Sequence, residues 1–424
     1  MTSRWSAQLT PLRLPGFRNL FFATFGSSVG TLLAAVALAL DVKDRTASSP
    51  NSGLWVGAVL VVEFLPTIFV GLLLGPLLDR LERRLLMIAA DVLRVGVFVA
   101  LPFAPNATTV VGLALVAGLA TGFFRPAVYA GVPNLVPDED LPAANALLQT
   151  VENASWAIGP LIGGALTSAA GPSASYAINA ASFVVSVVLL VRIPSRLLQS
   201  ERALSRGHWR DLSDGFVSTL RSPSMRAVLV GWGIASLAAG GANVAEPFLA
   251  KNTFSAGDFG YGLLYGAIGS GLVVGSFGSA PALARYSVAR VYGVGLGILA
   301  VGYLAVAASP NVWVAALCCV VTGIGNGAAI ACNALLVQRG TFDLMRGRAL
   351  TFVMSVTYLL VGIGNGLGGL FLDRAGARWM WGGAGGAVLV AAVAGSLLAR
   401  KLGGESAAAA EVAPAERAPV ATAN

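Results

Sequence analysis

The sequence has 424 residues, of which 56% are hydrophobic and only 11% are charged. A soluble domain carries roughly a quarter charged residues, so this composition excludes an ordinary soluble fold. The excess of 28 Lys and Arg over 20 Asp and Glu does not indicate a nucleic-acid partner, because the basic residues flank long apolar runs. These features predict a protein that crosses the bilayer many times.

Apolar runs bounded by charged residues, Pro or Gly predict twelve membrane-spanning helices. A helix needs about 20 residues to cross the hydrocarbon core, and the runs have about this length. The first run has no small-residue cleavage site, so we expect it to remain as the first span rather than act as a signal peptide. The predicted spans are 17–41, 53–77, 85–104, 108–131, 142–167, 173–193, 226–250, 259–283, 290–308, 311–335, 348–372 and 378–400.

The distribution of basic residues predicts the orientation. With the N terminus in the cytoplasm, most Lys and Arg residues fall in cytoplasmic segments, as the positive-inside rule requires. Both chain termini are then cytoplasmic. The exceptions are Lys43, Arg45, Lys251, Arg374 and Arg378 on the outer side, and Arg94 and Arg125 within spans.

An internal repeat predicts two homologous halves. Residues 159–164 read GPLIGG in the fifth span, and residues 364–369 read GNGLGG in the eleventh. We therefore expect six-helix bundles at 1–193 and 226–402, joined by an amphipathic cytoplasmic linker at 194–225. The Ala-, Glu- and Pro-rich tail at 403–424 is expected to be disordered.

Cysteine and histidine usage argues against enzymes and metal sites. Cys318, Cys319 and Cys332 lack metal-ligand spacing, and the single histidine, His208, lies in a charged loop. No P-loop motif for ATP is present, and the Gly-rich stretches at 323 and 362 lie inside spans rather than after strands. We expect no enzymatic activity, no metal and no cofactor.

The loop after the second span carries the most specific motif. Residues 75–84 read GPLLDRLERR, a glycine followed by an acid and a basic cluster. This motif resembles the cytoplasmic signature of the major facilitator superfamily. The likeness extends to Phe124-Arg125-Pro126-Ala127 and to GPLIGG, and resembles the branch of multidrug, macrolide and enterobactin exporters. It implies an all-α membrane protein with twelve helices in two pseudo-symmetric six-helix bundles.

The resemblance implies a cytoplasmic gate. We expect Gly75 to permit close helix approach and Asp79 to sit at the positive N-terminal end of the eleventh helix. Arg83 and Arg84 can hold Asp91, Asp138 or lipid phosphate, and Arg125 is an alternative partner for Asp79. Simple positive-inside topology is a second explanation for the arginines, though not for Gly75 and Asp79. The predicted gate residues are Gly75, Asp79, Arg80, Arg83, Arg84, Asp91 and Arg125.

The glycine-rich motif of the fifth span, Gly159, Pro160, Gly163 and Gly164, is associated with antiporters by the same resemblance. Small residues permit tight helix packing, and proline removes a backbone hydrogen bond and favours a bend. Structural packing alone is a sufficient alternative explanation for these residues.

Acidic residues within spans are candidates for proton coupling. Glu63 lies near the middle of the second span, where a carboxylate costs roughly 2.5 kcal/mol or more. It shares a helical face with Thr67 and Gly71, so we expect it to face a wet cavity. Glu152 is the second candidate. Asp41 and Glu246 lie near the outer ends of their spans and are either coupling residues or solvated rim residues.

Two positions depart from the exporter pattern. Thr31 stands where related exporters often have an acid, and Ala114 stands near the expected arginine of the fourth span. We therefore expect Glu63 to take over the coupling role, or transport to be uncoupled.

These observations predict a proton-driven exporter of an amphipathic small molecule, a drug, siderophore or secondary metabolite, in the inner membrane of a bacterium. Its expected partners are this substrate, protons and lipid, and we expect a monomer. A nutrient importer or uniporter, or a non-transporting sensor or scaffold on the same fold, are the alternatives. The expected substrate-binding residues are Trp156, Asn153, Trp232, Asn243, Phe352 and Tyr358.

Overall fold

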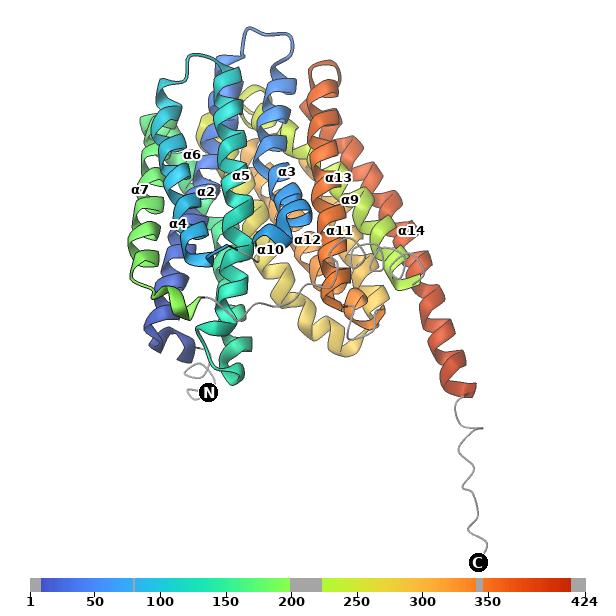
Figure 1. The fold of residues 1–424 in the computed structure, drawn as a ribbon. Helices are drawn as coiled ribbons and strands as arrows, with labels where there is room; N and C mark the ends of the chain where they lie inside the picture. The colour runs from blue at the N-terminus through green and yellow to red at the C-terminus, as the bar shows by residue number, and fades with distance from the viewer. Residues whose placement is uncertain (1–8, 79–80, 199–222, 341–345, 413–424) are drawn as a thin grey trace, which may run out of the picture.

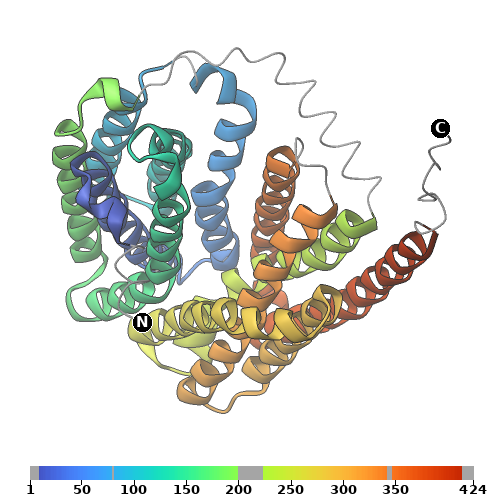
Figure 2. The same cartoon turned by 90° about the horizontal axis from the view of Figure 1, so that it is seen from below.

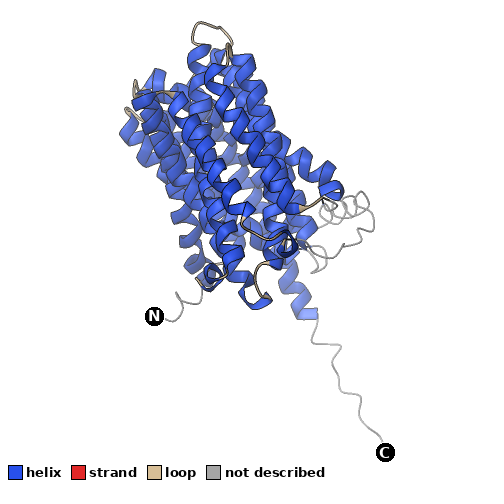
Figure 3. Cartoon of the chain, turned by 60° about the vertical axis from the view of Figure 1, so that its left-hand side comes forward, coloured by secondary structure: helices blue, strands red, loops and turns tan. Residues whose placement is uncertain are grey.

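A computed structural model describes residues 9–78, 81–198, 223–340 and 346–412. Within these ranges the regular structure is entirely helical, with no strand (Figure 3). Asp79, Arg80 and most of the predicted linker lie outside the described residues.

The described residues form twelve long helices, which confirms the predicted fold class (Figure 1). The N-terminal half contains α2 (Pro15–Arg45), α3 (Ser52–Leu78), α4 (Arg83–Ala100), α5 (Ala107–Gly131), α6 (Leu141–Ala170) and α7 (Pro172–Val191). The C-terminal half contains α9 (Pro223–Phe248), α10 (Gly257–Arg285), α11 (Val288–Ala308), α12 (Val312–Gly340), α13 (Arg346–Ala375) and α14 (Ala377–Val412).

The outer surface of the molecule is apolar. Among the described residues, 9 helices are long and apolar enough to cross a membrane by length and composition. Large side chains such as Phe103, Phe277 and Trp379 are 81%, 72% and 79% exposed. Lipid tails can cover such a surface without the cost that water would impose. The helix α6 falls short of the same criterion because its first half carries Gln149, Glu152 and Asn153.

Local sequence explains where several helices end. Gly171 adopts a φ of 77°, which a residue without a Cβ accepts readily, and the chain reverses there between α6 and α7. Asn106 caps α5, because its side chain accepts a hydrogen bond from the Thr109 amide. Pro247 lacks an amide hydrogen, and the helix α9 continues beyond it as a π-helical turn, η6 (Leu249–Thr253).

The last helix is longer than predicted. The helix α14 runs to Val412, whereas the sequence predicted disorder from Gly403 onward. The run from Ala407 to Glu411 consists of strong helix formers, which extend a helix that is already nucleated. The predicted disorder of residues 413–424 lies outside the described residues.

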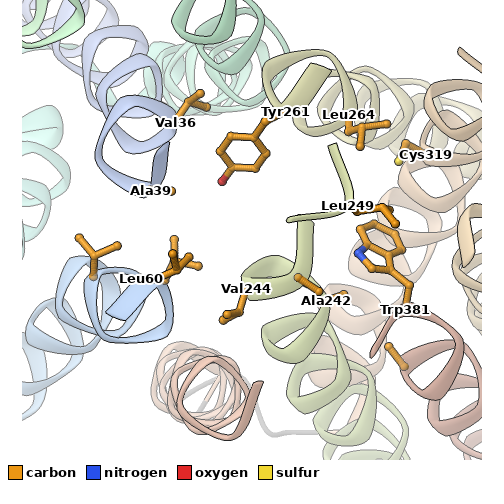
Figure 4. Close-up of a cluster of buried hydrophobic side chains, with 14 of the residues drawn as sticks. Val36, Ala39, Leu60, Ala242, Val244, Leu249, Tyr261, Leu264, Cys319 and Trp381 are labelled. Carbon is orange, nitrogen blue, oxygen red and sulfur yellow. The ribbon is translucent and has the colours of Figure 1, made fainter. Parts of the chain in front are cut away.

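The two halves form separate groups of helices (Figure 2). They meet along two helix pairs, each with one helix from either half. The helix α6 packs against α10, and α13 packs against α3. Glycines allow this close approach: a Cβ on Gly164 would lie 2.6 Å from the Cα of Gly262. A buried hydrophobic cluster also crosses between the halves, and Tyr261 of α10 points from the second half toward Ala39 of α2 (Figure 4).

Candidate functional site

A cavity lies mainly within the N-terminal half. Its empty volume is about 1190 Å³, open solvent included. Residues from α2 to α7 line it, and Tyr358 of α13 closes it from the other half. The lining residues are Thr24, Ser27, Ser28, Thr31, Leu32, Ala35, Leu38, Glu63, Arg94, Phe98, Ala114, Ala117, Gly118, Thr121, Phe124, Arg125, Val128, Tyr129, Glu152, Ser155, Trp156, Phe183 and Tyr358.

Glu63 lines this cavity, as its helical face predicted. Its Oε2 atom is buried and has no hydrogen-bond partner within the described part of the chain. The helix α5 holds the backbone at this point, because a Cβ on Gly118 would lie 3.1 Å from the Glu63 carbonyl oxygen. A buried acceptor without a partner is costly, so this oxygen is a departure from ordinary packing that calls for an explanation.

Arg125, Tyr129 and Glu152 form a second polar group in the cavity. Arg125 Nη2 donates to Glu152 Oε1 at 2.6 Å, and Tyr129 Oη donates to the same oxygen at 2.8 Å. Asp79, for which the sequence offered Arg125 as an alternative partner, lies outside the described residues, and the structure pairs Arg125 with Glu152. The reason is that α5 and α6 both present these side chains to the cavity.

Asp91 and Arg94 form an ion pair in the interior of the N-terminal half. They lie one turn apart on α4, and Arg94 Nη2 donates to Asp91 Oδ1. The Arg94 guanidinium also lies over the rings of Phe124 and Phe183, with its Cζ 4.5 and 4.3 Å from the two centroids. Arg94 lines the cavity but was not predicted as a site residue. Its spacing of three residues from Asp91 inside an apolar span was the available signal.

Arg83 and Arg84 do not hold Asp91 or Asp138, contrary to one predicted interaction. Arg83 Nη1 donates to the carbonyl oxygen of Ala130 at 2.8 Å. Arg84 Nη2 donates to the carbonyl oxygen of Val191 at 2.6 Å. These arginines therefore bind the carboxyl ends of α5 and α7, where free carbonyl groups and the helix dipole favour a cation. Asp91 is out of their reach because it lies two turns further along α4.

The glycine-rich motif of α6 packs against two neighbouring helices. A Cβ on Gly159 would lie 2.8 Å from the Cβ of Leu32, and one on Gly163 would lie 2.5 Å from the Leu33 carbonyl oxygen. Gly164 faces Gly262 of α10 instead, beside the Pro160 carbonyl. The motif thus brings α6 close both to α2 and to the second half of the molecule.

The predicted substrate-binding residues divide into two groups. Trp156 and Tyr358 line the cavity. Trp156 also contacts Tyr265 edge-on, with ring centroids 5.8 Å apart. The other predicted residues lie outside the lining that the structure describes: Asn153, Trp232, Asn243 and Phe352.

One face of α2 that carries hydroxyl groups was not among the predicted site residues. Thr24, Ser27, Ser28 and Thr31 all line the cavity. Their spacing of three and four residues places them on one helical face, and this periodicity was the signal that could have identified them.

Asp41 and Glu246 are buried rather than solvated, at 7% and 2% exposed. Asp41 accepts hydrogen bonds from Arg45 Nε at 2.7 Å and from Tyr176 Oη at 3.0 Å. Glu246 Oε1 has no partner among the described residues, and Glu246 does not belong to the described cavity lining. Their predicted role in proton coupling stays a prediction.

The end of the molecule beyond α2 and α9 carries polar contacts between the halves that the sequence did not reveal. Lys251 of η6 binds Asp44 of α2 at 2.7 Å and Asp258 of α10 at 2.6 Å. The Gly53 amide of α3 donates to Asp373 Oδ2 of α13 at 3.2 Å. Lys43 lies 5.0 Å from the ring centroid of Phe248. These contacts hold the two halves together at this end.

The arrangement of the helices is the fold of the major facilitator transporters. Among solved structures, the chain is similar to a bacterial homologue of the iron transporter ferroportin in an inward-facing state, with a TM-score of 0.71 and 16% identity over 91% of this chain and 98% of that one. It is also similar to a bacterial homologue of the human lysosomal transporter Spinster, with a TM-score of 0.70 and 16% identity over 90% and 96% of the two chains.

Sequence comparison assigns the family. Residues 6–422 match the family described as transmembrane secretion effector, so the chain belongs to this family of major facilitator transporters. It is 27% identical to the uncharacterized MFS-type transporter YkuC of Bacillus subtilis and 30% identical to the enterobactin exporter EntS of Shigella boydii. These matches cover 59% and 62% of this chain, and 63% of the length of either relative. Macrolide efflux protein A of Streptococcus pyogenes is 22% identical over 84% of this chain and 90% of its own.

Proposed function

We propose that this protein exports an amphipathic small molecule across the bacterial inner membrane in exchange for protons. The carboxyl group of Glu63 carries the proposal, because it lines the cavity with a buried oxygen that has no partner in the described structure. Such a group can take up a proton on one side of the membrane and release it on the other.

The composition of the cavity supports an amphipathic substrate. Aromatic rings of Phe98, Trp156 and Tyr358 provide apolar surface, and the hydroxyl groups of α2 provide a polar face. Ligand sites commonly combine an apolar lining with a few polar groups in this way. The names of two relatives, an enterobactin exporter and a macrolide efflux protein, support export of a bulky molecule.

We further infer that the structure represents an inward-facing state. With the N terminus in the cytoplasm, as the basic residues predict, the contacts of Lys251 and Asp373 close the outer end. Alternating access then requires these contacts to break while the halves rock toward each other at the cytoplasmic end. A proton that moves inward through a membrane potential of 100 mV releases about 2.3 kcal/mol. This energy can drive export of the substrate against its concentration gradient.

Everted membrane vesicles test the proposal. Vesicles that contain the protein are energised by respiration, and the pH gradient is followed with acridine orange while macrolides, siderophores and dyes are added one at a time. An exported compound should partly dissipate the gradient and accumulate inside the vesicles, and an uncoupler should abolish its accumulation. Uptake that ignores the uncoupler would show facilitated diffusion and contradict proton exchange. Vesicles without the protein are the control.

A further inference from the structure

We propose that the cavity selects organic cations, and that the carboxylate of Glu63 binds the positive group of the substrate. This inference rests on the proposed function, since it names the chemical class of the exported molecule. The juxtaposition that carries it is one uncompensated carboxyl group among aromatic rings in a cavity whose two arginines already have acidic partners.

The charge balance of the cavity favours a cation. Arg94 is neutralised by Asp91, and Arg125 is neutralised by Glu152. Glu63 has no basic partner among the described residues. The other residues of the described lining are neither carboxylic acids nor Lys, Arg or His. The lining residues Glu63, Glu152, Arg94 and Arg125, counted together with Asp91 as the partner of Arg94, therefore carry one net negative charge when Glu63 is ionised.

An anionic substrate would meet a less favourable site. To reach the Arg125 guanidinium, it would have to displace Glu152, which also accepts a hydrogen bond from Tyr129. Arg94 is enclosed by Asp91 and by the rings of Phe124 and Phe183. The carboxylate of Glu63 would repel the same ligand.

Aromatic rings add a second attraction for a cation. Phe124 and Phe183 already contact Arg94, but Phe98, Trp156 and Tyr358 also line the cavity. The face of an aromatic ring attracts an ammonium or phosphonium group, most strongly where water is excluded. A lipophilic cation therefore fits this lining better than a neutral molecule of the same shape.

Binding of two ions of matched shape and opposite charge tests this proposal. Tetraphenylphosphonium and tetraphenylborate are titrated against the purified full-length protein in detergent at alkaline pH, without any ion gradient. The wild-type protein should bind the phosphonium ion at least about tenfold more tightly. Glu63→Gln should remove this preference, whereas Glu63→Asp, which keeps the charge, should retain it. Glu139→Gln makes the same chemical change at an exposed position and is the control.

Equal binding of the two ions, binding of neither, or a preference that survives Glu63→Gln would overturn the proposal. Size-exclusion chromatography shows whether each variant is folded. If Glu63→Gln is not folded, the test rests on Glu63→Asp, which should retain the preference for the phosphonium ion. The failure of this inference is distinguishable from the failure of the proposed function. A protein without charge preference can still dissipate the pH gradient of vesicles with a neutral substrate, and a cation-selective protein can fail to do so.

Discussion

Two glutamates within predicted spans, one in each half of the molecule, have different surroundings. Glu63 of α3 and Glu246 of α9 each have a carboxyl oxygen without a partner in the described structure. Glu63 lines the cavity together with hydroxyl and aromatic groups. Glu246 lies outside the described lining, at 2% exposed, in a half whose helices are packed closely through glycines such as Gly271 and Gly323.

Under the proposed function, a buried carboxyl oxygen alone does not make a glutamate a coupling residue. An acid exchanges protons with the aqueous phases only where water or substrate can reach it. In the proposed function the cavity of the N-terminal half supplies that access to Glu63, whereas the cavity lining described in the C-terminal half does not include Glu246. The following predictions test whether polar groups that water or substrate can reach are functional, and whether buried polar groups that neither can reach are structural.

The largest expected effect concerns a charge whose role we take to be structural. Asp91→Asn leaves the guanidinium of Arg94 buried and uncompensated, because Asp91 is 0% and Arg94 2% exposed. Such a loss typically costs about 3–5 kcal/mol. We expect a sharp fall in folded yield and thermal stability, measured by fluorescence-detected size-exclusion chromatography.

The control for this prediction is Asp138→Asn at an exposed position, which should behave as wild type. The double variant with Asp91→Asn and Arg94→Gln should regain part of the stability, because no isolated charge remains. If Asp91→Asn were as stable as wild type, water would have to solvate the guanidinium of Arg94 inside the N-terminal half, contrary to the structural role proposed for this pair.

The next effect concerns the contact between the halves. Gly164→Ala places a methyl group 2.6 Å from the Cα of Gly262, so α6 and α10 must separate. We expect the packed contact between α6 and α10 to be destabilised by about 1–3 kcal/mol. The transport rate should be several-fold slower. Gly112→Ala on α5 is a matched control, because nothing lies within 4 Å of its added Cβ. Equal transport by both variants would remove the packing role of the motif.

Much of this architecture follows from the sequence. Apolar runs and the repeat of GPLIGG predicted twelve helices in two halves, and the helical face of Glu63 predicted its place in the cavity. Contacts between side chains that are far apart in the sequence could not be predicted from these patterns. The partner of Arg125 depends on how α5 and α6 pack, and the ion pair of Lys251 with Asp44 joins residues of different halves. The arginines at 83 and 84 bind carbonyl groups, which no residue pattern encodes.

A smaller effect is expected at the outer end. Lys251→Gln removes the ion pair that joins the halves at Asp44. Partly exposed pairs contribute about 0–1 kcal/mol, so outward opening should increase by up to roughly fivefold. A single cysteine at Ala39, which is buried opposite Tyr261 (Figure 4), should then react faster with an impermeant maleimide added outside. Arg285→Gln, at the other end of α10, is the control. An unchanged reaction rate would contradict the outer-gate role.

The smallest effect is expected for Glu246. Glu246→Gln keeps the size of the side chain and removes its titration, at a site outside the described cavity lining. Uphill transport should therefore proceed at close to the wild-type rate in everted vesicles. If Glu246→Gln lost all uphill transport while still folded, the proposed difference between Glu63 and Glu246 would be wrong. The proton-coupling residue would then lie in the C-terminal half.

The most direct test of the account is the behaviour of Glu63→Gln in two transport modes. Proteoliposomes that contain this variant should still exchange labelled for unlabelled substrate at saturating substrate concentration, because the cavity keeps its shape even though a cation binds more weakly without the carboxylate. They should lose accumulation driven by a pH gradient, because the proton-binding group is gone. Accumulation by Glu63→Gln at the wild-type rate would contradict the account; if Glu152→Gln then failed to accumulate substrate, the coupling site would belong on α6.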